Sequence, residues 1–131
     1  VLPIPTSPQS TFKVGERPFG GGIDTGLGSV YVSNWGSNTV TVVEAKTHRW
    51  WDTITVGNRP FGVAVDADAR AIYVTNWESN SVSVIDANTR AVVNTIAVGA
   101  RPQGVAVDPR DGTVYVVNSG EGNVSVLGRA A

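Results

Sequence analysis

Arginine and aromatic side chains recur together along the chain, and they are the groups best suited to binding chemistry. A guanidinium can pair with a carboxylate, sulfate or phosphate. An indole in a polar turn can stack on a sugar ring or anchor a protein partner. We therefore predict that the ligand-binding residues are Arg17, Phe19, Trp35, Arg59, Phe61, Trp77, Arg101 and Gln103.

Each of these residues also has a structural alternative, which the sequence leaves open. A Trp can cover its own turn or the seam with the next repeat, and an Arg can pair with a carboxylate or a carbonyl there. Ser119 stands where the first two repeats have Trp. Any site at that position is therefore degraded in the third repeat.

The sequence offers little for catalysis or metal binding. It has no cysteine, which excludes thiolate chemistry. Its single histidine, His48, lies in a turn beside Arg49, and we expect it to be an exposed surface residue. The pair Asp66 and Asp68 only faintly resembles a calcium turn. We predict no catalytic residue, no metal and no cofactor, and an enzyme remains the alternative.

A repeat of 42 residues organises these motifs. Its copies begin at Val14, Val56 and Val98. A period near 40 with strand-like content is typical of a β-propeller, in which each repeat forms one four-stranded blade. The second copy predicts strands at 62–65, 71–75, 81–85 and 91–97, separated by polar turns.

Two further residue series recur with the repeat. An Asp ends each inner strand and should cap the turn that follows. An Asn begins the turn between the second and third strands, and we expect it to bond to its own turn. These residues are Asp24, Asp66, Asp108, Asn34, Asn76 and Asn118.

The two ends of the chain complement each other in sequence. Residues 10–14 align with the outer strands at 52–56 and 94–98, whereas the third copy ends after its third strand, at 123–127. We predict a three-blade unit over 10–131, in which strand 10–14 completes the blade of 98–131. Residues 1–9, with three prolines, read as an extended tether.

Three blades do not readily close a ring, because propellers commonly have about four to eight. An open arc would expose apolar faces and an unpaired strand edge. We favour a six-bladed homodimer, in which strand 10–14 pairs in trans. The alternative is that these blades are part of a longer propeller.

The order of strands in a blade places two kinds of loop at the same end. One is the link from an outer strand to the next inner strand, which carries the Arg-Pro pairs. The other is the turn after the second strand, which carries Trp35 and Trp77. The arginine and aromatic residues should therefore share one face.

Net charge and hydropathy exclude two classes of partner. The net charge of −1 gives no basic footprint for a nucleic acid. No apolar run approaches a membrane span. We predict neither nucleic-acid binding nor membrane insertion.

The segment "IYVTN" at 72–76, with "RPFGVAVD" before it and "NSVSVID" after it, resembles the YVTN β-propeller repeat. That family is typical of surface-layer and related secreted proteins, so the resemblance implies an extracellular or cell-surface location. It covers about residues 14–131.

We predict a non-catalytic recognition or scaffold module that binds carbohydrate or protein on its Arg/Phe/Trp face. One alternative is a fragment of a propeller enzyme of lyase or oxidoreductase type. Another is a purely structural or engineered unit that self-assembles.

Overall fold

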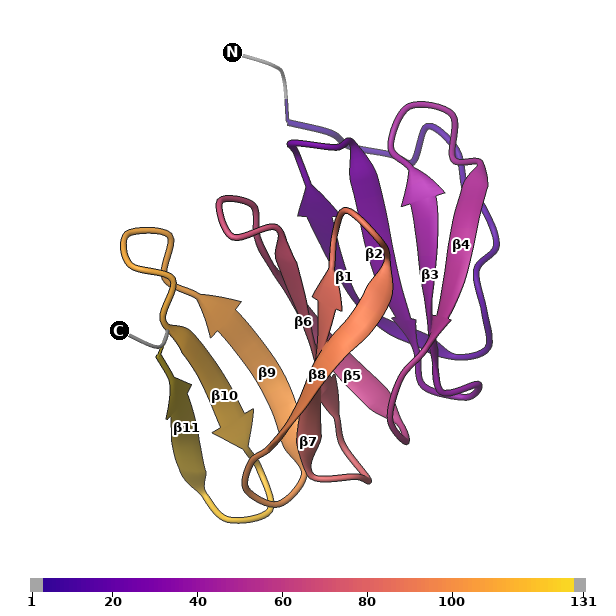
Figure 1. The fold of residues 1–131 in the computed structure, drawn as a ribbon. Coiled ribbons are helices and arrows are strands. Elements are labelled where there is room, and N and C mark those ends of the chain that lie inside the picture. Colours follow the sequence, from indigo (N-terminus) through magenta and orange to yellow (C-terminus); the bar gives the residue numbers. More distant parts are fainter. Residues whose placement is uncertain (1–3, 129–131) are drawn as a thin grey trace.

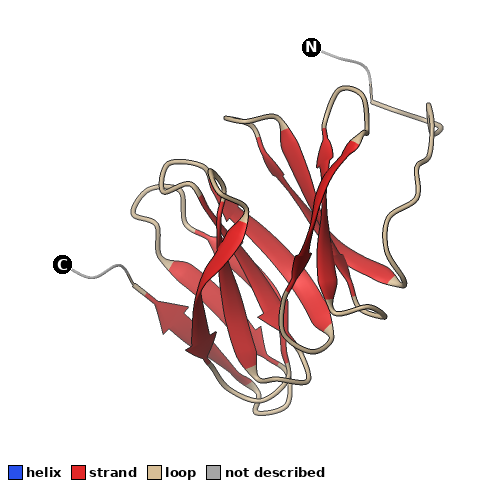
Figure 2. Cartoon of the chain, turned by 45° about the vertical axis from the view of Figure 1, so that its right-hand side comes forward, coloured by secondary structure: helices blue, strands red, loops and turns tan. Residues whose placement is uncertain are grey.

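The computed structural model describes residues 4–128, and every regular element in that range is a β-strand. Eleven strands form three antiparallel sheets of four, four and three strands. Figure 1 shows the sheets side by side, and Figure 2 shows the same arrangement of strands and connecting loops after a turn of 45°. The all-β prediction is confirmed.

Each sheet corresponds to one repeat of the sequence. The first contains β1 (Pro18–Asp24), β2 (Ser29–Asn34), β3 (Thr39–Glu44) and β4 (Trp50–Thr55). The second contains β5 (Pro60–Asp66), β6 (Ala71–Asn76), β7 (Ser81–Asp86) and β8 (Ala91–Ala97). The third contains β9 (Pro102–Val107), β10 (Val114–Asn118) and β11 (Asn123–Leu127).

The strands of the second sheet contain all four segments that the sequence predicts. The largest difference is at β5, which begins two residues before the predicted start, at Pro60. Pro60 pairs with Asn76 across a register shift that ends at Val63. A proline is tolerated there because the first residue of a strand can do without a ladder N–H.

Two buried clusters hold the three sheets together. Between the first and second sheets, Tyr31, Val42 and Ile72 are fully buried in one cluster. Between the second and third sheets, Val82 packs with Val114 and Val116. Burying one such side chain contributes roughly 1.5–3 kcal/mol. The seams between sheets therefore form the core.

The predicted Asp caps are confirmed in all three repeats. The Oδ1 atom of Asp24 accepts a hydrogen bond from Gly26 N at 3.0 Å. Asp66 accepts from Ala69 N at 3.1 Å, and Asp108 accepts from Arg110 N at 2.9 Å. These carboxylates hold the turn that follows each inner strand.

The Asn residues are structural, but their side chains do not bond to their own turn as expected. Asn34 Oδ1 accepts from Gly15 N at 3.1 Å, and its Nδ2 donates to Thr41 Oγ1 at 2.8 Å. Asn76 repeats the pattern with Gly57 N and Ser83 Oγ. Because each side chain is buried beside the incoming link, it clamps that link to the third strand.

The segment before the first sheet is not part of a strand. Residues 10–14 carry no strand assignment and lie beside the first sheet, where Trp50 Nε1 donates to Lys13 O at 2.9 Å. Phe12 stacks on His48, with ring centroids 4.6 Å apart. His48 is therefore half-buried rather than exposed, and the expectation of a free surface histidine is wrong.

The third sheet contains three strands, and within residues 4–128 no fourth strand lies on the outer side of β11. The pairing of residues 10–14 with a second chain therefore stays a prediction. The described part of the chain contains no helix with the length and apolarity to cross a membrane.

Candidate ligand face

The two kinds of loop that carry the predicted site meet at the same end of every sheet. Trp35 N donates to Arg17 O at 3.0 Å, and Trp77 N donates to Arg59 O at 2.9 Å. Ser119 N makes the equivalent bond to Arg101 O at 3.0 Å. These backbone bonds tie each turn to the preceding inter-blade link, so the arginine and aromatic residues share one face.

Four aromatic side chains on this face form one cluster, which we call the aromatic cluster. The ring centroids of Phe19 and Phe61 lie 4.3 Å apart, and those of Trp35 and Trp77 lie 5.1 Å apart. Trp35 joins the pairs through contacts of 5.4 Å to Phe19 and 5.8 Å to Phe61. Phe19 is 57% exposed, whereas the other three are half-buried.

The three arginines that precede proline share an unusual backbone conformation. Arg17, Arg59 and Arg101 have φ angles of 48°, 56° and 52°, in the left-handed region. This conformation costs a residue with a Cβ about 1–2 kcal/mol. Part of that cost is offset where Asn38 Oδ1 accepts from Arg59 N and Asn80 Oδ1 accepts from Arg101 N, each at 2.9 Å.

The second and third arginines stack on the tryptophans of the preceding repeat. Arg59 Cζ lies 5.3 Å from the Trp35 ring centroid, and Arg101 Cζ lies 5.1 Å from that of Trp77. Arg59 Nε also lies 3.2 Å from Glu78 Oε2. Each cation–π contact is worth about 0.5–1 kcal/mol at an exposed site. The two tryptophans therefore lie at the seam with the next repeat, and Arg59 pairs with a carboxylate, as in the structural alternative.

A small hollow opens at each seam beside these contacts. The first, of 240 Å³, is lined by Trp35, Gly36, Asn38, Asn58, Arg59 and Glu78. The second, of 380 Å³, is lined by Trp77, Glu78, Asn80, Ala100 and Arg101. Trp, Asn and Arg occupy equivalent positions in both, so the repeat presents a similar hollow twice.

The remaining predicted residues lie at the margins of the face. Arg17 is exposed, and its guanidinium makes no hydrogen bond or ion pair with any residue in the range 4–128. Gln103 is half-buried, and its backbone oxygen accepts from Thr75 Oγ1 at 2.7 Å. Gln103 thus contributes its main chain to the second seam.

Three residues that were not among the predicted binding residues contribute to this face. Asn38 and Asn80 hold the arginine backbone, and Glu78 pairs with Arg59. Asn38 and Asn80 are 42 residues apart, so the repeat itself indicates that they have the same role.

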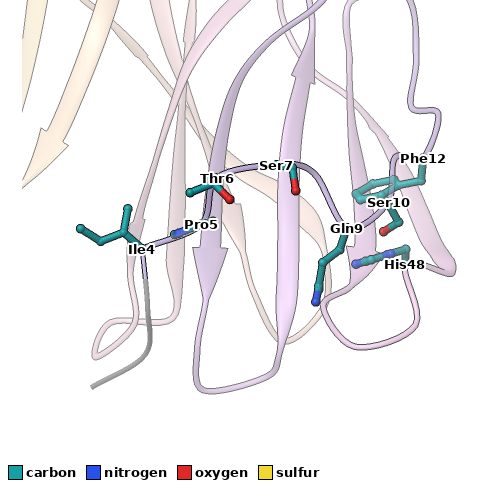
Figure 3. A pocket seen from close by; sticks show the side chains of 8 residues that line it. All are labelled: Ile4, Pro5, Thr6, Ser7, Gln9, Ser10, Phe12 and His48. Carbon is teal, nitrogen blue, oxygen red and sulfur yellow. The ribbon is translucent and has the colours of Figure 1, made fainter.

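A larger hollow of 790 Å³ lies away from the face. It is formed by the segment from Ile4 to Phe12 together with His48. Figure 3 shows this segment beside the strands of the first sheet, with Phe12 over His48. Among residues 4–128, no group of three or more His, Cys, Asp or Glu side chains could hold a metal ion.

Comparison with known proteins supports a propeller fold. No family model matches the sequence, and no curated protein matches it. A chain of hydrazine synthase from Kuenenia stuttgartiensis is 30% identical, with a TM-score of 0.81 over 94% of this chain. This chain spans 36% of that relative's length.

Two more distant structures share the fold. A chain of a nidogen/laminin complex is 21% identical, with a TM-score of 0.69 over 86% of this chain and 43% of that one. The dihydro-heme d1 dehydrogenase NirN is 19% identical, with a TM-score of 0.70 over 92% of this chain and 26% of that one. The protein is therefore of the β-propeller class. Its sheets have the arrangement of propeller blades.

Proposed function

We propose that the protein is a non-catalytic recognition module, and that its aromatic cluster binds a partner protein. The observation that carries the proposal is the exposure of Phe19, which is 57% exposed at the margin of a cluster of four stacked rings. Arg17 lies two residues away, and its guanidinium has no partner among the described residues. Exposed aromatic rings beside arginine are the side chains enriched at the energetic centres of protein interfaces.

A protein ligand fits this face better than a carbohydrate. Sugar rings stack on uncovered indole faces, but guanidiniums lie over Trp35 and Trp77. The two rings also contact each other at 5.1 Å. What remains accessible is a phenyl ring and two exposed arginines, Arg17 and Arg101. An acidic segment with an apolar side chain would satisfy both features.

Peptide and glycan arrays test this proposal directly. We expect acidic, apolar-containing peptides to bind the wild-type chain and to lose about tenfold or more in affinity in the Phe19→Ala and Arg17→Ala variants. Val93→Ala is a matched control, because Val93 is 60% exposed on β8 away from the face. Glycan binding lost in Phe19→Ala would support a carbohydrate ligand instead. No signal on either array would favour the scaffold alternative.

We also propose that the three sheets are blades of a six-bladed ring closed by a second copy. Support comes from the third sheet, whose three strands leave β11 at an edge, and from exposed valines on that sheet. The motif at 72–76 supports membership of the YVTN repeat family and, through it, an extracellular or cell-surface location.

A second candidate function follows from the likeness to hydrazine synthase at 30% identity. In that case the three blades belong to a longer propeller in an enzyme. The two candidates differ in what covers the third sheet: a second copy in the first case, and further blades of the same chain in the second.

A further inference from the structure

The two internal seams share one contact, in which a glycine of one inner strand lies against a backbone carbonyl of the inner strand of the next sheet. A Cβ on Gly20 would overlap Phe61 O, and a Cβ on Gly62 would overlap Gln103 O. The inner strands can approach this closely only because both positions lack a side chain.

A hydroxyl group completes each of these seams. Ser33 Oγ accepts from Gly20 N at 2.9 Å and donates to Phe61 O at 2.7 Å. Thr75 Oγ1 accepts from Gly62 N and donates to Gln103 O, both at 2.7 Å. The side chain therefore satisfies one backbone group on each side of the seam.

The third sheet presents the same surface with no sheet of the described chain against it. A Cβ on Gly104 would meet only the Val117 side chain, at 3.7 Å, which is an ordinary contact. Tyr31, Val40 and Val42 are fully buried at the first seam. Their equivalents on the third sheet, Tyr115, Val124 and Val126, are 41%, 52% and 60% exposed.

The repeat predicts which residues would pair with the outer edge of β11. Thr41 pairs with Thr53 in the first sheet, and Ser83 pairs with Thr95 in the second. Applying the repeat of 42 to either pair places Thr11 opposite Ser125. The same step from the neighbouring pairs places Phe12 opposite Val124. Phe12 is 42% exposed, and its ring would leave His48 to cover that valine.

We propose that a second copy of this chain docks on the third sheet, and that it supplies two specific contacts. Residues 10–13 of that copy form the fourth strand on β11, and its Phe19 carbonyl lies against Gly104. The inference rests on the proposed ring closure and names the contacts that produce it.

The path of the chain at Gly15 supports a second copy as the occupant. Gly15 N is held by Asn34 Oδ1 just as Gly57 N is held by Asn76 Oδ1, each at 3.1 Å. The chain therefore enters the first blade as it enters the second. Residues 52–55 and 94–97, just before the equivalent glycines Gly57 and Gly99, lie in the outer strand of the preceding blade. Residues 10–13 have the same place in the repeat and lie in no strand of their own chain.

The seam between copies is weaker than the internal seams, because Val117 replaces the bridging hydroxyl. On docking, Gly104 N and the facing Phe19 O would lose water without gaining a side-chain partner. Val117→Thr restores the bridge seen at Thr75, and it should tighten the dimer by about tenfold. Gly104→Ala places a methyl group against the docked carbonyl and should weaken the dimer by about a hundredfold or more.

Cysteine cross-linking tests the register, and the absence of native cysteine makes the chain suited to it. We expect a mixture of Thr11→Cys and Ser125→Cys chains to form a disulfide-linked heterodimer under mild oxidation. Thr11→Cys mixed with Val124→Cys should not, because adjacent residues of a strand point to opposite faces. A doubly substituted chain that cross-links only within itself, or the absence of any cross-link, would overturn the proposal.

Sedimentation equilibrium of Gly104→Ala and Val117→Thr gives the second test, with chemical unfolding of each dilute monomer as the folding control. Unchanged association of Gly104→Ala would overturn the docking geometry. The cross-link between Thr11→Cys and Ser125→Cys chains reports assembly alone, and the peptide arrays report recognition alone. Failure of the assembly and failure of the recognition proposal are therefore separable.

Discussion

Arg59 lies over Trp35 from a left-handed backbone, with its guanidinium carbon 5.3 Å from the ring centroid and a φ of 56°. The backbone strain and the stacking contact are comparable in size, about 1 kcal/mol each. The side chain therefore compensates for a conformation that glycine would adopt more easily. Arg101 and Trp77 repeat the relationship at the next seam.

Replacing Arg59 by glycine should not stabilise the protein, although it removes the backbone strain. Because the variant also loses the contact with Trp35 and the pairing with Glu78, we expect its free energy of unfolding to be about 0.5–1 kcal/mol lower than that of Arg70→Gly. Arg70→Gly is the matched control, because Arg70 has a φ of 54° and is exposed in a turn. Urea unfolding should show Arg70→Gly to be neutral or stabilising. The same gain at both positions would contradict this account.

The Thr75 hydroxyl should contribute more to stability than an ordinary surface hydroxyl. Thr75→Val keeps the shape of the side chain but leaves Gly62 N and Gln103 O unpaired in the seam. We expect a loss of about 1–3 kcal/mol in the free energy of unfolding. Thr89→Val, in an exposed turn, should change it by less than about 0.5 kcal/mol. Denaturation curves that coincide for Thr75→Val and the wild type would refute the bridging role.

Asn76→Ala should cost about 2–3 kcal/mol, because the side chain is fully buried and bonds to both the inter-blade link and β7. Asn94→Ala provides a comparison at an exposed position, where the side chain bonds only to the next backbone N–H. Thermal unfolding of the two variants measures the difference. Equal melting temperatures would show that the clamp on the link is dispensable.

Stability should fall in alkaline solution because of Tyr31. Burial raises the pKa of this phenol above its ordinary value of 10.0, and the charge of Asp24 raises it further. Below about pH 10 the phenol is neutral in both states, so its contribution is fully present. At higher pH the unfolded chain ionises first, and the free energy of unfolding falls by at most about 1.4 kcal/mol per pH unit.

Tyr31→Phe removes this ionisation and should flatten the alkaline part of the curve. Unfolding by urea at about pH 8 and about pH 11 measures the two slopes. Identical alkaline slopes for Tyr31→Phe and the wild type would contradict the assignment.

Much of the fold could be predicted from the sequence, because each repeat contains the same turn and strand signals. The Asp caps and the strands of the second sheet follow from turn chemistry and alternation over a few residues. The partners of Asn34 could not be predicted in this way, since Gly15 and Thr41 reach it only through the packing of the blade.

The sequence predicted which residues share the candidate face, but not how their side chains contact one another. Strand order placed Trp35 and Arg59 at one end of the blades, which the structure bears out. The stacking of one on the other depends on the left-handed backbone at Arg59, which arginine rarely adopts. The position of Phe12 over His48 depends on where the segment lies when it is not in a strand.

Native mass spectrometry of the unmodified chain tests the central claim most directly. Ring closure by a second copy predicts a species of twice the 13.7 kDa chain mass that dissociates on dilution. A folded monomer that persists at high micromolar concentration, with β11 still unpaired, would contradict the account.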